Sequence, residues 1–154
     1  MIVALAEYLP YLVVMAVAIA TFRSWKARDK DQVKGYVLAI VSGGISRGIV
    51  EVIRFFYHHP RPPVALRITP LFPETSYSFP SGHAVFFFGL AMGVYFVNKR
   101  FGILLFIFST LICLARVAAG VHWPSDIFAG AVLGILVSVT IFNIWNQSHN
   151  KKKE

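Results

Sequence analysis

Three arginines and two histidines in the middle of the chain have the residue types that phosphate chemistry requires. They are Arg54, Arg61, Arg116, His83 and His122. The planar guanidinium group of arginine presents donors in a fork that matches the oxygens of a tetrahedral anion. Imidazole can serve as a nucleophile or as a proton donor near neutral pH. Together these side chains predict a phosphate receptor that also carries the groups needed to transfer the phosphate.

Short local patterns would orient these groups. Asp126 follows His122 by four residues, and Pro124 between them suits the first position of a helix. This spacing lets the carboxylate hold one imidazole nitrogen and leaves the other free to attack. Residues 80–83, Pro-Ser-Gly-His, read as a helix entry whose free amides favour an anion. Gly82 would let the backbone approach that anion closely.

Each feature also has a structural explanation when taken alone. A lone histidine at a helix end is more often a satisfied interface group, and a lone arginine near a membrane surface is usually an anchor. A Pro-Ser-Gly string is most often a turn. The predicted topology places all these features at one membrane face, and their joint occurrence there favours a functional site. His58 and His59 lack such a context and are interpreted as interfacial loop residues. Arg67 and Glu74 are interpreted as solvated, with the alternative that they line the substrate entrance.

Long apolar runs must position these residues. The hydrophobic fraction of the 154-residue chain is 56%, its mean hydropathy is +0.64, and 14% of its residues are charged. These values are typical of a membrane protein, and about 20 helical residues cross a hydrocarbon core of about 30 Å. We therefore predict an all-α, polytopic membrane helix bundle that forms a single domain over residues 1–154. Its transmembrane helices, about five, are expected at residues 2–22, 35–57, 82–97, 101–120 and 124–145.

Basic residues between the runs predict the orientation. They are Arg23, Lys26, Arg28, Lys30 and Lys34; Lys99 and Arg100; and Lys151, Lys152 and Lys153. With five helices all three groups fall on one side, which the positive-inside rule identifies as cytoplasmic. The N-terminus is then outside, the C-terminus inside, and the site on the extracytoplasmic face. The first run lacks the basic leader of a secretory signal, so we interpret it as a retained helix.

The remaining polar and small residues leave several alternatives. The net charge of +8 does not indicate nucleic-acid binding, because the basic residues form no stripe. Arg47 and Glu51 are interpreted as a buried, self-satisfying pair, with the alternative that Glu51 orients Arg54. The single Cys113 excludes an intrachain disulfide. Glycines four apart predict close packing within the bundle rather than dimerisation: Gly44 and Gly48, Gly89 and Gly93, Gly130 and Gly134.

Three segments resemble the signature of the type 2 phosphatidic acid phosphatase superfamily. The first motif, a basic residue, six others and Arg-Pro, is matched at residues 54–62, and the second, Pro-Ser-Gly-His, at residues 80–83. The third, Ser-Arg, five others, His, three others and Asp, is matched at residues 115–126, with Ala115 in place of serine. Arg54 stands where lysine is common, which keeps the positive charge. The chain is one helix short of the six-helix plan of many membrane members.

The resemblance implies a core like that of acid phosphatases and vanadium haloperoxidases. It implies that His122 is the nucleophile and forms a phosphohistidine, that Asp126 orients it, and that His83 protonates the departing oxygen. The residues implied to bind phosphate are Arg54, Arg61, Ser81, Gly82 and Arg116. No metal and no other cofactor would be needed, because the arginines supply the positive charge.

Residues 61–83 are similar to loops of bacterial undecaprenyl-diphosphate phosphatases of this superfamily. The implied reaction converts undecaprenyl diphosphate to undecaprenyl phosphate and phosphate at the outer face of the membrane, as part of cell-wall synthesis. A phosphatidate or phosphatidylglycerophosphate phosphatase is the alternative, because phosphate motifs do not report the lipid tail. Vanadate-dependent haloperoxidases share the motifs but are soluble and larger. A non-enzymatic lipid-phosphate binder would not need His122 and Asp126, and the sequence does not fix the oligomeric state.

Overall fold

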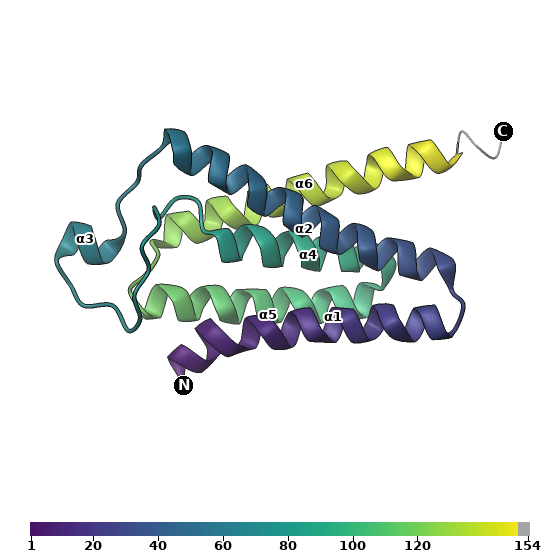
Figure 1. Ribbon diagram of the computed structural model, residues 1–154, viewed down its shortest axis with the longest axis horizontal. Helices are drawn as coiled ribbons and strands as arrows, with labels where there is room; N and C mark the ends of the chain where they lie inside the picture. The colour runs from purple at the N-terminus through teal and green to yellow at the C-terminus, as the bar shows by residue number, and fades with distance from the viewer. Residues whose placement is uncertain (151–154) are drawn as a thin grey trace.

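The computed structural model describes the backbone of residues 1–150 and the side chains of residues 1–148. All its regular elements are helices, which confirms the predicted all-α bundle (Figure 1). A π-helical turn, η1 (Ala4–Tyr8), continues into α1 (Leu9–Lys26). The following elements are α2 (Lys30–Phe56), α3 (Pro62–Leu66), α4 (Gly82–Val97), α5 (Lys99–Ala118) and α6 (Pro124–Asn150).

Each predicted transmembrane helix coincides with a helix of the structure. Four are long and apolar enough to cross a membrane, namely Ala4–Lys26, Lys30–Phe56, Lys99–Ala118 and Pro124–Ser148, and α4 is a shorter apolar helix. Helix α2 begins earlier than its apolar run because Asp29 caps it. The Asp29 carboxylate accepts a hydrogen bond from the Gln32 amide at 3.0 Å, which satisfies a free donor of the first turn.

The short helix α4 lies at the centre of the bundle, against α2, α5 and α6 (Figure 1). Small residues let the helices approach, and a Cβ atom added at Gly93 would overlap Ala39 of α2. A Cβ atom added at Gly130 would lie 2.8 Å from the Ala84 Cβ. The predicted packing role is therefore confirmed for the glycines of α4 and α6. It is wrong for Gly44 and Gly48, whose added Cβ atoms would meet nothing within 4 Å.

We expect Gly134→Ala to destabilise the bundle. A Cβ atom at Gly134 would overlap the carbonyl of Val85 and lie 2.9 Å from the amide of Gly89, and neither backbone atom can move without separating α4 from α6. Overpacking of this kind costs about 1–3 kcal/mol. Gly44→Ala is the matched control, because its added methyl group meets open space. The melting temperature in detergent should be lowered for Gly134→Ala but not for Gly44→Ala. Equal melting temperatures of the two variants would contradict the close packing of α4 on α6 at Gly134.

The connections divide between the two ends of the bundle. The α1–α2 and α4–α5 links lie at one end, and the segment containing α3 lies at the other, beside the start of α6 (Figure 1). The two basic groups at residues 23–34 and 99–100 thus share one end. Lys151, Lys152 and Lys153 lie outside the described residues. The proline-rich segment is helical only over α3, which begins with prolines at the positions where a helix tolerates them.

Candidate active site

At the α3 end of the bundle, the two predicted catalytic histidines are joined through arginines and one carboxylate. His122 Nε2 lies 3.3 Å from Arg61 Nη1, and His83 Nε2 lies 3.5 Å from Arg116 Nη1. Glu74 bridges the two arginines, because Arg61 Nη2 is 3.4 Å from its Oε2 and Arg116 Nη2 donates to its Oε1. The structure therefore brings side chains from the proline-rich loop, α4, α5 and the α5–α6 link into one cluster.

His122 and Asp126 are adjacent, as their spacing predicts. His122 Nδ1 lies 3.4 Å from Asp126 Oδ2, and that oxygen also accepts hydrogen bonds from the Ser78 hydroxyl and, at 2.9 Å, from the Trp123 amide. Both side chains are buried. These contacts fix the imidazole through Nδ1 and leave Nε2 facing Arg61. The carboxylate–imidazole arrangement is suited to a nucleophile that attacks through Nε2.

The environment of His122 favours the neutral imidazole. Burial lowers the pKa of His122 from its ordinary 6.5 to about 4. The hydrogen bond to Asp126 opposes this shift, whereas the charges of Arg61 and Arg116 add to it. A neutral imidazole retains its lone pair at neutral pH, which is the form that a nucleophile requires.

The acidic limb of the pH profile should therefore lie near pH 4. Protonation of His122 removes the attacking lone pair, and a lowered pKa keeps the neutral form populated down to a more acidic pH. We expect kcat/KM to stay high as pH falls through 6.5 and to decline close to 4. The pKa of the substrate phosphate is measured separately by phosphorus NMR, and its effect is removed from the pH profile of kcat/KM. A limb at 6.5 after that correction would show an unperturbed histidine.

Loop carbonyls and hydroxyls hold Arg54 and Arg61 in place. Arg54 donates from Nη2 to the Pro80 carbonyl at 3.0 Å and from Nη1 to the Ser76 hydroxyl at 3.3 Å. Arg61 donates from Nε to the Ser76 carbonyl at 2.6 Å and from Nη1 to the Val121 carbonyl at 2.7 Å. Burial lowers the pKa of Arg61, and the nearby Arg116 lowers it further, while the Glu74 carboxylate acts in the opposite direction.

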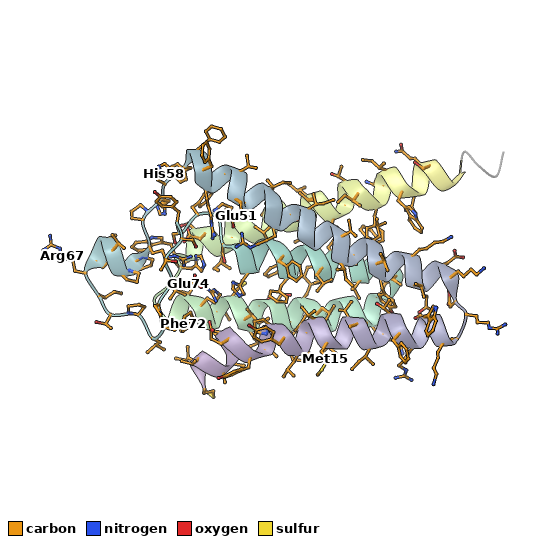
Figure 2. All side chains as sticks on the ribbon, viewed as in Figure 1. Met15, Glu51, His58, Arg67, Phe72 and Glu74 are labelled. Atoms are coloured by element: carbon orange, nitrogen blue, oxygen red, sulfur yellow. The ribbon has the colours of Figure 1, made fainter. Side chains whose placement is uncertain are left out.

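Two buried guanidinium donors have no hydrogen-bond partner among the described residues. They are Arg54 Nε and Arg116 Nε, although both side chains are at least nine-tenths buried. Buried donors in proteins are nearly always paired, so such groups call for a ligand or ordered water. The Arg116 guanidinium also lies 5.5 Å from the ring centroid of Phe72, a residue of the loop (Figure 2).

Ser81 and Gly82 organise the entry to α4. The Ser81 hydroxyl accepts a hydrogen bond from the Ala84 amide at 3.4 Å and caps the helix. The Ser81 amide donates to the Asp126 carbonyl at 3.1 Å, which ties α4 to α6. The close approach at Gly82 is made by Arg47, because an added Cβ atom would lie 2.8 Å from Arg47 Nε. The need for glycine there is thus explained by a side chain of α2.

Glu74 was predicted to be solvated, with a position at the substrate entrance as the alternative, and the solvated interpretation is wrong. Its side chain is 25% exposed and forms ion pairs with Arg61 and Arg116 at the inner side of the loop (Figure 2). Burial raises the pKa of Glu74, but the two guanidinium groups outweigh burial and bring the pKa below its ordinary value. The sequence did contain one signal for these ion pairs, because Glu74 is a single acid in a loop that also carries Arg61. Arg67, in contrast, is exposed and points away from the bundle (Figure 2).

Other acidic residues also reach the arginines. Glu7 Oε1 lies 3.8 Å from Arg116 Nη1. The sequence signal for this contact was that Glu7 is a lone charge inside an apolar run. Glu51 pairs with Arg47 and lies 3.5 Å from Arg54 Nη1, so both interpretations of Glu51 describe real contacts. The pair is not buried, because the side chains of Arg47 and Glu51 are 44% and 56% exposed.

The two loop histidines differ from each other. His58 is exposed and stacks on Tyr77. His59 is not merely interfacial, because its Nδ1 lies 3.9 Å from Asp126 Oδ1. Sequence reasoning missed this contact, and the pattern of the loop carries no signal for it. Among the side chains of residues 1–148, no three His, Cys, Asp or Glu residues are grouped so that they could hold a metal ion.

Comparison with known proteins identifies one family and several relatives. The family model of the PAP2 superfamily matches residues 32–150. Undecaprenyl-diphosphatase BcrC of Bacillus subtilis is 28% identical over 130 residues, which cover 84% of this chain and 67% of the relative. The bacitracin transport permease protein BcrC of Bacillus licheniformis is 25% identical over 140 residues, covering 90% of this chain and 67% of the relative. An undecaprenyl-diphosphatase of Sulfolobus acidocaldarius is 34% identical over 120 residues, but the match spans 77% of this chain and only 56% of that protein.

Solved structures have the same fold. LpxE of Aquifex aeolicus superimposes with a TM-score of 0.70 at 30% identity, covering 90% of this chain and 83% of LpxE. A PAP2-type phosphatidylglycerolphosphate phosphatase of Bacillus subtilis superimposes with a TM-score of 0.65 at 22% identity, covering 92% of this chain and 71% of that protein, and this likeness concerns the fold. The family match covers most of the chain, and the membrane helices agree with it. The chain belongs to the PAP2 superfamily and is an integral membrane protein of its phosphatase class.

Proposed function

We propose that this protein removes the terminal phosphate of undecaprenyl diphosphate at the extracytoplasmic face of the membrane. The observation that carries the proposal is the chain of contacts from His122 through Arg61, Glu74 and Arg116 to His83. In our proposal, His122 acts as the nucleophile and His83 as the acid, on either side of a phosphate that Arg61 and Arg116 bind. Two of the relatives are named undecaprenyl-diphosphatases, which favours a polyprenyl diphosphate as the lipid.

In the proposed reaction the terminal phosphoryl group takes the place of the Glu74 carboxylate. His122 Nε2 attacks phosphorus, a P–N bond forms, and the bond to the bridging oxygen breaks. His83 gives its proton to that oxygen, and undecaprenyl phosphate departs. Water, deprotonated by the now neutral His83, then attacks the phosphohistidine, the P–N bond breaks, and inorganic phosphate is released. Both histidines return to their starting states.

The arginines supply the positive charge for this transfer. Arg54, Arg61 and Arg116 face the oxygens of the phosphoryl group, and the free Nε donors of Arg54 and Arg116 gain acceptors when it binds. Charge stabilisation by preorganised donors in a water-poor site is a large part of phosphoryl-transfer catalysis. We therefore propose a metal-independent reaction without a cofactor. Residues 1–154 form one membrane-embedded phosphatase domain in this proposal.

A phosphatidylglycerophosphate phosphatase is the second candidate. Phosphatidylglycerophosphatase B of Bacillus subtilis is 30% identical over 112 residues, which cover 66% of this chain and 53% of that protein. A phosphatidylglycerolphosphate phosphatase is also among the structural neighbours. The same arginines and histidines would serve that monoester, with a glycerol oxygen as the leaving group.

The test is a substrate panel with the purified protein in detergent and EDTA. Undecaprenyl diphosphate, phosphatidate and phosphatidylglycerophosphate are compared at equal mole fraction in the micelle. We expect phosphate release in EDTA, with the highest kcat/KM for undecaprenyl diphosphate. A higher value for phosphatidylglycerophosphate would select the second candidate. Activity lost in EDTA and restored by magnesium would overturn the metal-independent reaction.

A further inference from the structure

Arg47 lies beside the acid histidine on the membrane side of the site. Its guanidinium group packs on Gly82. A Cβ atom added at Gly82 would lie 2.8 Å from Nε and 2.9 Å from Cζ of Arg47, so a side chain there would displace the guanidinium group. Glu51 accepts a hydrogen bond from Nη1 of Arg47. Nη1 is the one guanidinium nitrogen of Arg47 that makes a hydrogen bond among the described residues. Arg47 therefore retains donors for a ligand next to His83.

Two openings border His83 and Phe87, and their charges differ. One, of about 170 Å³, is lined by Arg47, Gly82 and Phe86 in addition to those two residues. The other, of about 330 Å³, is lined by Glu7 and Glu74 together with apolar residues of η1 and α1. Both openings adjoin His83, so each is a candidate position for the leaving group that His83 protonates. An anionic leaving group gains the Arg47 guanidinium in the first opening, whereas in the second it faces two carboxylates that already pair with Arg116.

We propose that the opening at Arg47 is a subsite for the second phosphate of a lipid diphosphate, the phosphate that remains on the lipid. The proposal rests on the proposed function, because it assigns the leaving group of that reaction. His83 then lies between the two phosphates, where it can donate its proton to the bridging oxygen. The forked guanidinium of Arg47 presents donors suited to phosphate oxygens. Arg47 is a specificity-determining residue, because it distinguishes a diphosphate from a monoester.

The position of Arg47 along α2 suits such a lipid. Arg47 precedes Arg54 by two helical turns, which is about 10 Å along the helix axis toward the interior of the bilayer. The second phosphate carries the hydrocarbon chain, so it must lie deeper than the phosphate that is removed. Phe86 and Phe87 in the same opening provide an apolar wall for the first part of that chain. Glu51, shared by Arg47 and Arg54, holds both guanidinium groups on one face of α2.

The decisive measurement is binding of two soluble probes to the purified full-length protein in detergent. Methylenediphosphonate has two phosphonates joined by a carbon that cannot be hydrolysed, and methylphosphonate has one. Titration calorimetry gives the ratio of their dissociation constants without requiring turnover. We expect wild type to bind methylenediphosphonate at least tenfold more tightly, and Arg47→Gln to reduce this preference at least fivefold. Lys34→Gln, which removes an exposed cation from the other end of α2, should leave the ratio unchanged.

Turnover gives the second readout. Arg47→Gln should lower kcat/KM for farnesyl diphosphate at least tenfold more than for farnesyl phosphate, and Arg47→Lys should recover part of the difference. Arg47→Met, which keeps an unbranched side chain against Gly82, replaces Arg47→Gln if that variant does not fold. Equal losses of kcat/KM on the two farnesyl substrates would contradict the subsite, and so would an unchanged ratio of the probe dissociation constants in Arg47→Gln. Either result holds even if the wild type hydrolyses undecaprenyl diphosphate. A probe ratio that depends on Arg47 supports the subsite even if another lipid proves to be the substrate in the panel.

Discussion

His122→Ala is expected to lower kcat on the lipid substrate by about 10³-fold or more, because it removes the nitrogen that attacks phosphorus. The buried imidazole is fixed by Asp126 on one side and faces Arg61 on the other, so no neighbouring side chain can take over its role in the same geometry. Phosphate release under single-turnover conditions measures the effect. The arginines remain in the variant, so lipid binding should change far less than turnover.

Two further measurements separate this role from a structural one. Terminally labelled substrate should give an alkali-stable, acid-labile phosphoprotein in wild type and none in His122→Ala. His58→Ala is the matched control, since His58 is an exposed histidine of the loop that stacks on Tyr77 alone among the described aromatic rings. Activity of His122→Ala close to that of His58→Ala would reject His122 as the nucleophile.

The fold was largely predictable because membrane helices are determined by apolar length, which the sequence shows directly. Boundaries moved where a polar residue caps a helix, as Asp29 does at α2. The central position of α4 was not predicted. It follows from glycines whose facing partners lie far along the chain, such as Gly134 against Val85 and Gly89. Spacing identifies small residues but not the helix that they meet, so Gly44 and Gly48 gave the same pattern on an open face.

The site was predictable to the extent that its residues lie in local motifs. His122 and Asp126 meet through one helical turn, and Ser81 caps the helix that begins at Gly82. The contacts of Glu7 and Glu74 with the arginines were missed because they join distant segments. Glu74 reaches Arg116 across 42 positions, and nothing in its own segment distinguishes it from a solvated loop carboxylate.

The same limit applies to Arg47 and Gly82. The glycine was interpreted through an approaching anion, whereas the space beside it is filled by a guanidinium group from α2. A local pattern shows that a close approach is needed, but it does not identify the group that approaches. The tertiary structure therefore identifies the group that requires the glycine, which the motif alone does not.

The second large effect is expected for His83→Ala, and it should depend on the leaving group. A general acid contributes about 10²–10⁴-fold when the departing oxygen is a poor leaving group, and much less when it departs readily as an anion. The loss of kcat/KM should therefore be greatest with phosphatidate, whose leaving group is an aliphatic alcohol. It should be about tenfold or less with p-nitrophenyl phosphate, whose phenolate needs little protonation.

This dependence distinguishes an acid from a residue that only supports the site. His83 Nε2 lies 3.5 Å from Arg116 Nη1, and the His83 ring stacks on Phe87. If His83 only supports the site, its removal displaces that arginine. Displacement of Arg116 would weaken phosphate binding for every substrate alike, and the losses on phosphatidate and p-nitrophenyl phosphate would be equal. An acid that protonates the leaving oxygen must give unequal losses, because only the alcohol needs the proton. Equal losses across the two leaving groups would therefore remove His83 from the proton-transfer step and leave it a positioning residue for Arg116.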